Sequence, residues 1–145
     1  MRPAKLGLAS ALGLALVAAL PARAMTDPEL NPELPPTLNN GAVKYMSGGI
    51  SRNQQSAMER DASGYPLELR FLASGRAYGP AYVPVKIRSR SGKVILDATS
   101  NGPLMLADVP DGRYTVSARH AGRTETLDAN VEHGKRETLA FDWKY

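Results

Sequence analysis

The sequence predicts an all-β protein, a seven-stranded antiparallel sandwich preceded by a short N-terminal helix and an extended tail. Two observations indicate this fold. Downstream of Gly64, apolar and polar residues alternate in short segments, as they do in strands that bury one face. Turn-forming Gly, Pro and Asn residues separate these segments at the spacing of an antiparallel sandwich.

Residues 1–24 have the pattern of a secretory signal peptide. Arg2 and Lys5 precede an apolar run over residues 6–20, and Ala22-Arg23-Ala24 matches an A-x-A cleavage site. The run is shorter than the roughly 20 residues that span a bilayer, which argues against a membrane anchor. We therefore expect cleavage after Ala24, a periplasmic or secreted protein, and no membrane span in the mature chain.

The mature chain is expected to be nearly neutral and to fold without disulfides. Removal of the signal peptide leaves 15 basic residues against 14 acidic ones, which gives no electrostatic reason to expect nucleic acid as a partner. The chain contains no cysteine, which excludes thiol nucleophiles and thiolate metal ligands. Stability in an oxidising compartment must then come from a hydrophobic core.

Two segments are expected before the sandwich. Residues 25–49 are rich in Pro and Asn and poor in large apolar residues, which predicts a flexible tail. In residues 50–64, Ser51 followed by Gln54 matches a capping box and predicts a helix from Arg52 to about Ala62. The glycines of Ser47-Gly48-Gly49 could hold an anion at the helix start, but the P-loop lysine is missing, and a flexible joint is the simpler interpretation.

The sandwich itself is expected over residues 65–145. Its seven predicted strands cover 65–72, 82–88, 94–98, 104–106, 113–120, 123–131 and 137–143. In the strand at 113–120, the residues at even positions share one apolar face and those at odd positions share a polar face. Pro84 cannot donate to a ladder, so the strand at 82–88 is expected at a sheet edge or with a bulge.

The segment Val109-Pro110-Asp111-Gly112-Arg113-Tyr114-Thr115-Val116 resembles the L-P-x-G-x-Y-x-V signature of carboxypeptidase-regulatory-like domains. These domains are transthyretin-like, Ig-like sandwiches, and the resemblance covers about residues 65–143. The whole chain is similar to small exported proteins of Gram-negative bacteria that carry this domain. The resemblance implies a non-catalytic folding or interaction module. In the signature, proline presets the turn and glycine permits a positive φ.

No catalytic, cofactor or metal site is expected. A hydroxyisourate hydrolase is one enzyme that the transthyretin-like fold suggests, but the chain ends Phe141-Asp142-Trp143-Lys144-Tyr145 and lacks that group's C-terminal motif. His120 and His133 are the two histidines, fewer than the three or four ligands of a metal site. A periplasmic small-ligand or metal-handling protein that uses both histidines remains the alternative function.

The remaining candidate is a surface for interaction, formed by Tyr82, Lys86, Arg88 and Arg90. An exposed aromatic residue beside a basic stripe suits a binding interface. The same charges could instead serve only to keep a sheet edge from aggregating. We expect an exported, non-catalytic β-sandwich that binds a protein or a cell-envelope component and needs no cofactor.

Overall fold

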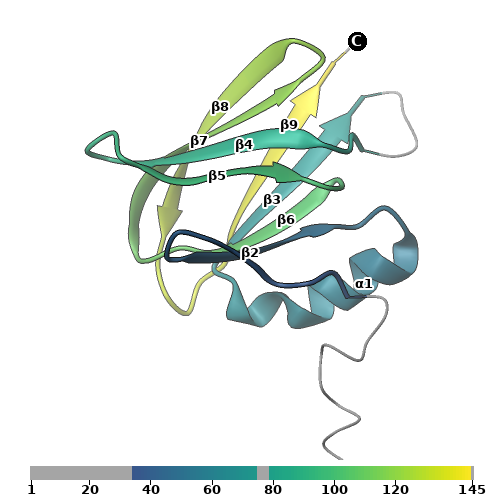
Figure 1. Ribbon diagram of the computed structural model, residues 1–145, viewed down its shortest axis with the longest axis horizontal. Coiled ribbons are helices and arrows are strands. Elements are labelled where there is room, and N and C mark those ends of the chain that lie inside the picture. The colour runs from purple at the N-terminus through teal and green to yellow at the C-terminus, as the bar shows by residue number, and fades with distance from the viewer. Residues whose placement is uncertain (1–33, 75–78, 145) are drawn as a thin grey trace, which may run out of the picture. The chain divides into compact units, whose positions relative to one another are not determined.

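The computed structural model describes residues 34–74 and 79–144, which form a mostly β protein with one helix (Figure 1). The helix α1 covers Arg52–Asp61 and continues into a short 3-10 turn, η3, over Ala62–Gly64. The strands of this part of the chain are β1 (Leu38–Asn40), β2 (Val43–Gly48), β3 (Leu67–Ala73), β4 (Val83–Ser89), β5 (Val94–Ser100), β6 (Leu104–Asp108), β7 (Gly112–His120), β8 (Arg123–Val131) and β9 (Glu137–Trp143).

The strands form two sheets. Sheet A has five strands in the order β1-β2-β6-β3-β9, and sheet B has four in the order β5-β4-β7-β8. Neighbouring strands are antiparallel except β3 and β9, which are parallel. The strands β4 and β7 are therefore the interior strands of sheet B, and β5 and β8 are its edges.

The main core lies between the two sheets, because alternate residues of both sheets are buried there together. Phe71, Phe141 and Trp143 form an aromatic group in this core, with ring centroids 5.7 to 6.3 Å apart. A second apolar cluster joins α1 to the other face of sheet A through Met58 of the helix and Met46 and Leu106 of the sheet. Sheet A thus has both faces covered, whereas sheet B is covered on its inner face.

An ion-pair network also ties α1 to sheet A. Arg70 of β3 contacts Glu59 of α1 at 3.1 Å and the buried Glu68 at 3.3 Å, and Thr138 of β9 donates to Glu68 at 3.1 Å. Burial of Arg70 acts to lower its pKa, but the hydrogen bond to Glu59 and the charge of Glu68 outweigh that effect and raise the pKa of Arg70. Arg70 therefore links Glu59 of the helix to Glu68 of the sheet.

Three parts of the predicted fold are corrected. The described residues form nine strands rather than seven, the pairing of β3 with β9 is parallel, and the helix lies between β2 and β3 instead of at the N-terminus. Residues 38–48, expected within the flexible tail 25–49, form β1 and β2. They are ordered because Val43 and Met46 are buried and β2 pairs with β6. The predicted signal peptide and residues 25–33 lie outside the described residues.

The expectation that Pro84 marks an edge strand is wrong, since β4 is interior. A bulge is present in β4, but between Ile87 and Arg88. Pro84 is tolerated because the pairing of β4 with β7 begins one residue later, at Val85, so no bond of that ladder needs its missing N–H. The predicted helix start at Arg52 and the seven strands downstream of Gly64 are confirmed.

Candidate interaction surface

The outer face of sheet B is the sheet face that neither the core nor α1 covers. It is polar because the inward residues of each strand are the apolar ones. Its outward residues are Pro84, Lys86 and Arg88 of β4, Val94, Asp97 and Thr99 of β5, Arg113, Thr115, Ser117 and Arg119 of β7, and Thr124, Thr126, Asp128 and Asn130 of β8.

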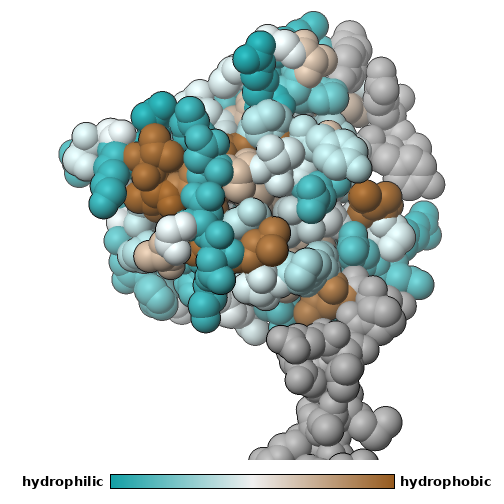
Figure 2. Space-filling view, viewed as in Figure 1, coloured by the Kyte–Doolittle hydropathy of each residue, from teal (hydrophilic) through white to brown (hydrophobic). Residues whose placement is uncertain are grey.

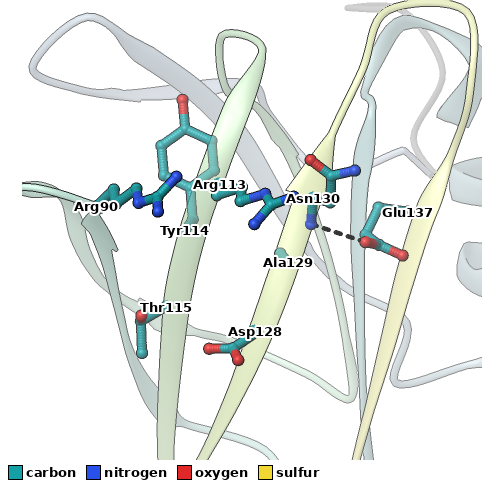
Figure 3. A pocket seen from close by; sticks show the side chains of 8 residues that line it. All are labelled: Arg90, Arg113, Tyr114, Thr115, Asp128, Ala129, Asn130 and Glu137. Carbon is teal, nitrogen blue, oxygen red and sulfur yellow. Dashed lines mark hydrogen bonds between the residues drawn. The ribbon is translucent and has the colours of Figure 1, made fainter.

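Two shallow hollows lie on this face. One of about 410 Å³ is lined by Arg90, Arg113, Thr115, Asp128 and Asn130, together with Glu137 of β9 (Figure 3). The other, of about 350 Å³, is lined by Pro84, Lys86, Arg88, Asp97, Ser117 and Arg119. Figure 3 shows the arginines at one end of the first hollow and Thr115 and Asp128 at the other.

The strand register brings the basic residues together. Lys86 lies opposite Ser117 and Arg88 lies opposite Thr115, so the long side chains of β4 stand beside the short ones of β7. Arg113 and Arg119 stand at the two ends of β7. We call these five residues the basic stripe: Lys86, Arg88, Arg90, Arg113 and Arg119.

Most of the basic stripe forms no ion pair with the described residues. Lys86 Nζ lies 3.9 Å from Asp97 Oδ2, and Arg88 Nη1 donates to the carbonyl of Gly92 at 3.5 Å. Across residues 34–74 and 79–144, no hydrogen bond or ion pair engages the guanidinium groups of Arg90, Arg113 and Arg119. These groups are available to a ligand without breaking an internal contact.

Of the four residues named from the sequence, Lys86, Arg88 and Arg90 line the hollows of the outer face. Tyr82 precedes β4 and is 73% exposed. Its backbone φ is 58°, a conformation that residues other than glycine rarely adopt. Sequence reasoning missed Arg113 and Arg119, although both belong to the polar face predicted for residues 113–120.

The two histidines are not brought together. His120 ends β7 and packs against Trp143, with ring centroids 5.4 Å apart. His133 donates its backbone N–H to Asp111 Oδ1 at 2.9 Å, and its ring also contacts that carboxylate. Asp111 precedes β7, so the length of that strand, roughly 30 Å, separates the histidines. No cluster of three or more His, Cys, Asp or Glu residues in the described ranges could hold a metal ion.

The Gly48-Gly49 segment has a structural role at the start of α1. The N–H groups of Gly49 and Ile50 donate to Gln54 Oε1 at 2.7 and 3.3 Å, and the Gln54 N–H donates to Ser51 Oγ at 3.1 Å. These donors are the ones that an anion would have to use. The Ser51 half of the predicted capping box is present, whereas the Gln54 side chain accepts from the N–H groups of Gly49 and Ile50 and thereby occupies the place of the suggested anion cradle.

Few large apolar side chains are exposed on the described surface. The large apolar side chains exposed there are Leu38, Ile50, Leu72, Tyr82 and Val94. In the view of Figure 2, apolar side chains lie in separate patches among hydrophilic ones. No helix in the described part of the chain is both long and apolar enough to cross a membrane. The surface that offers directed chemistry is therefore the basic stripe.

The fold and this surface define a β-rich, two-sheet protein with one helix-covered sheet and one basic polar face. No family model matches the chain, and no curated protein matches it. Among solved structures, the chain is similar to S.CueP, with 12% sequence identity and a TM-score of 0.41. The similarity covers 51% of this chain and 58% of S.CueP.

Proposed function

We propose that this chain is an exported, non-catalytic β-sandwich module that binds a protein or a cell-envelope component through the outer face of sheet B. The observation that carries the proposal is that the guanidinium groups of Arg90, Arg113 and Arg119 form no ion pair within the described residues and lie on a sheet face that neither the core nor α1 covers. Guanidinium groups bind carboxylate and phosphate oxygens in a bidentate geometry. The partner is therefore expected to be negatively charged.

The position of the basic stripe favours binding over simple protection against aggregation. Charges that protect a sheet stand on its edge strands, where unpaired backbone groups would recruit another strand. Lys86 and Arg88 stand on β4, and Arg113 and Arg119 stand on β7, which are the interior strands of sheet B. Protection of an edge does not require charge at these positions.

The same proposal includes export and membership among the carboxypeptidase-regulatory-like domains. The signal-peptide pattern of residues 1–24 supports export. The resemblance at residues 109–116 supports the family assignment, and so does the local geometry of that segment. The Tyr114 hydroxyl donates to the carbonyl of Pro110 at 2.6 Å, so the signature tyrosine fastens the turn that precedes β7.

Site-specific cross-linking in the cell envelope tests the proposed function. A photo-reactive residue replaces Thr115, at the centre of the outer face, or Ser56, on the exposed side of α1 as a control. We expect a specific adduct at Thr115, absent at Ser56 and lost in the R113E/R119E variant. Absence of any adduct at Thr115, or an equal adduct at Ser56, would contradict the proposal. Circular dichroism of the double variant establishes that it is folded.

Handling of a small anionic ligand is a second candidate, which the volumes of the two hollows favour. At about 410 and 350 Å³, they lie in the range of small-molecule sites. Calorimetric titration with citrate tests this candidate. Binding that is lost in Arg113→Gln but retained in Arg60→Gln, a substitution on α1, would support it, and no binding would remove it.

A further inference from the structure

We infer that the ligand of the outer face is an extended acidic peptide segment whose carboxylates recur at every second residue. This inference rests on the proposed function, because it names the chemistry of the partner that the same face would bind. It is carried by the spacing of the basic stripe, by the two carboxylates that flank the stripe, and by the kinds of side chain that the face lacks.

The basic stripe contains at least one cation in each of four successive rows across β4 and β7. The first row contains Pro84 of β4 and Arg119 of β7. Ala118 pairs with Val85, so the next residue of β7, Arg119, lies beside Pro84, and both line the same hollow. The next two rows contain Lys86 and Arg88, and the last contains Arg90 and Arg113, which line one hollow together. Successive rows are two residues apart, so the cations recur about every 6.8 Å along the strands.

An extended peptide laid along the strands has the same repeat. Its alternate side chains point to one side and are also spaced about 6.8 Å apart. Acidic side chains at positions i, i+2, i+4 and i+6 would each face one row of the stripe. Four consecutive acidic residues would direct only two side chains towards the face.

Carboxylates on both sides of the basic stripe favour a ligand that is one extended chain wide. Asp97 of β5 lies beside Lys86, and Asp128 of β8 lies opposite Thr115 in the row of Arg88. A broad anionic surface, such as a membrane, would bring negative charge against both carboxylates. A narrow chain that follows β4 and β7 would lie over the basic stripe, with Asp97 to one side and Asp128 and Glu137 to the other.

The side chains of the outer face also select against other polyanions. Its outward strand residues include hydroxyl, amide and charged groups, and the aromatic residues near them in the described ranges are Tyr82, which precedes β4, and the mostly buried Tyr114 of the first hollow. No row of rings in these ranges follows the basic stripe. Stacking on aromatic side chains is the usual means of holding the bases of single-stranded nucleic acids. Arginine forks match planar carboxylates, and the threonine and serine hydroxyls between them can donate to the same oxygens.

Isomeric peptides test the spacing directly. Two labelled octapeptides contain four Glu and four Ser, either strictly alternating or as two blocks, and their binding to the mature chain is followed by fluorescence anisotropy at low salt. Exposed ion pairs contribute roughly two- to fivefold each. Two additional pairs should therefore make the alternating peptide bind about tenfold more tightly, and added salt should weaken it.

Matched variants locate the effect. Arg88→Gln should weaken the alternating peptide several-fold, whereas Arg136→Gln, at an exposed position after β8, should leave its binding unchanged. Equal binding of the two isomers would overturn the inference while the cross-linking test of the proposed function still stands. Tighter binding of inorganic polyphosphate or of vesicles with anionic lipid would also overturn it. Failure of every anionic probe, with no adduct at Thr115, would overturn both.

Discussion

Replacement of Gly102 by alanine should be among the most destabilising single-methyl additions in this protein. Gly102 lies in the turn between β5 and β6, against the end of β2. A Cβ atom at this position would lie 2.2 Å from the carbonyl oxygen of Gly48 and 2.5 Å from its carbonyl carbon. Both neighbours are backbone atoms, so a side-chain rotation cannot relieve the overlap.

The expected loss combines strain with broken hydrogen bonds. Inserting a methyl group into a well-packed site costs about 1–3 kcal/mol. The backbone shift would also disturb two local hydrogen bonds, from the Asn101 N–H to Ser47 Oγ at 3.0 Å and from Ser100 Oγ to the Gly102 carbonyl at 2.7 Å. Each contributes about 1 kcal/mol. The free energy of unfolding should therefore fall by about 3–5 kcal/mol.

Urea unfolding followed by the fluorescence of Trp143 measures this change, because Trp143 is the single tryptophan and is 2% exposed. Gly64→Ala is the matched control, since nothing lies within 4 Å of the added Cβ. Its unfolding free energy should change by less than about 1 kcal/mol. A Gly102→Ala variant within about 1 kcal/mol of the wild type would refute the close packing of β2 on this turn.

Two further predictions concern the ends of β7. Tyr114→Phe should lower the unfolding free energy by about 1 kcal/mol in urea, because the hydrogen bond to Pro110 is lost. Burial, and then the charge of Asp111, raise the pKa of Tyr114, so the folded state keeps a proton that the unfolded state loses. The stability difference between wild type and variant should therefore narrow above pH about 10, and a constant difference would contradict this assignment. Ala121 has a φ of 52° in a two-residue turn with Gly122, a backbone conformation that asparagine adopts more readily than alanine. Ala121→Asn should therefore raise the unfolding free energy by about 0.5–1 kcal/mol in thermal melts. An unchanged or lower melting midpoint would argue against backbone strain at Ala121.

The sequence predicted the parts of the fold whose signal is local. Strands such as β4 and β7 bury one face, so apolar and polar residues alternate along them. The signal for β2 is different, because Met46, Ser47 and Gly48 are all buried in succession. That strand lies between α1 and the other sheet, and a strand covered on both faces has no alternation to find. The prolines just before it then made the whole segment resemble a tail.

Part of the candidate surface was also predictable from a local pattern, and part was not. Lys86, Arg88 and Arg90 are close in sequence, so their common face follows from the period of a single strand. Arg113 and Arg119 join them only because β4 pairs with β7, a contact between segments about 30 residues apart that the pattern of either strand alone does not specify.

The arrangement of charge differs between the two sheets in a way that bears on function. Where α1 covers sheet A, Glu59, Arg70 and Glu68 neutralise one another within hydrogen-bonding distance. On the outer face of sheet B, Lys86 and Arg88 instead lie opposite Ser117 and Thr115. Like charges directly opposite one another destabilise a sheet, and the rows of Lys86 and Arg88 avoid such pairs, whereas Arg90 and Arg113 share the last row. A face selected only for solubility would be expected to intersperse both signs within its interior strands. The recurrence of cations along this face, with Arg90 and Arg113 together in one row, is the arrangement that the proposed binding of a negatively charged partner would require.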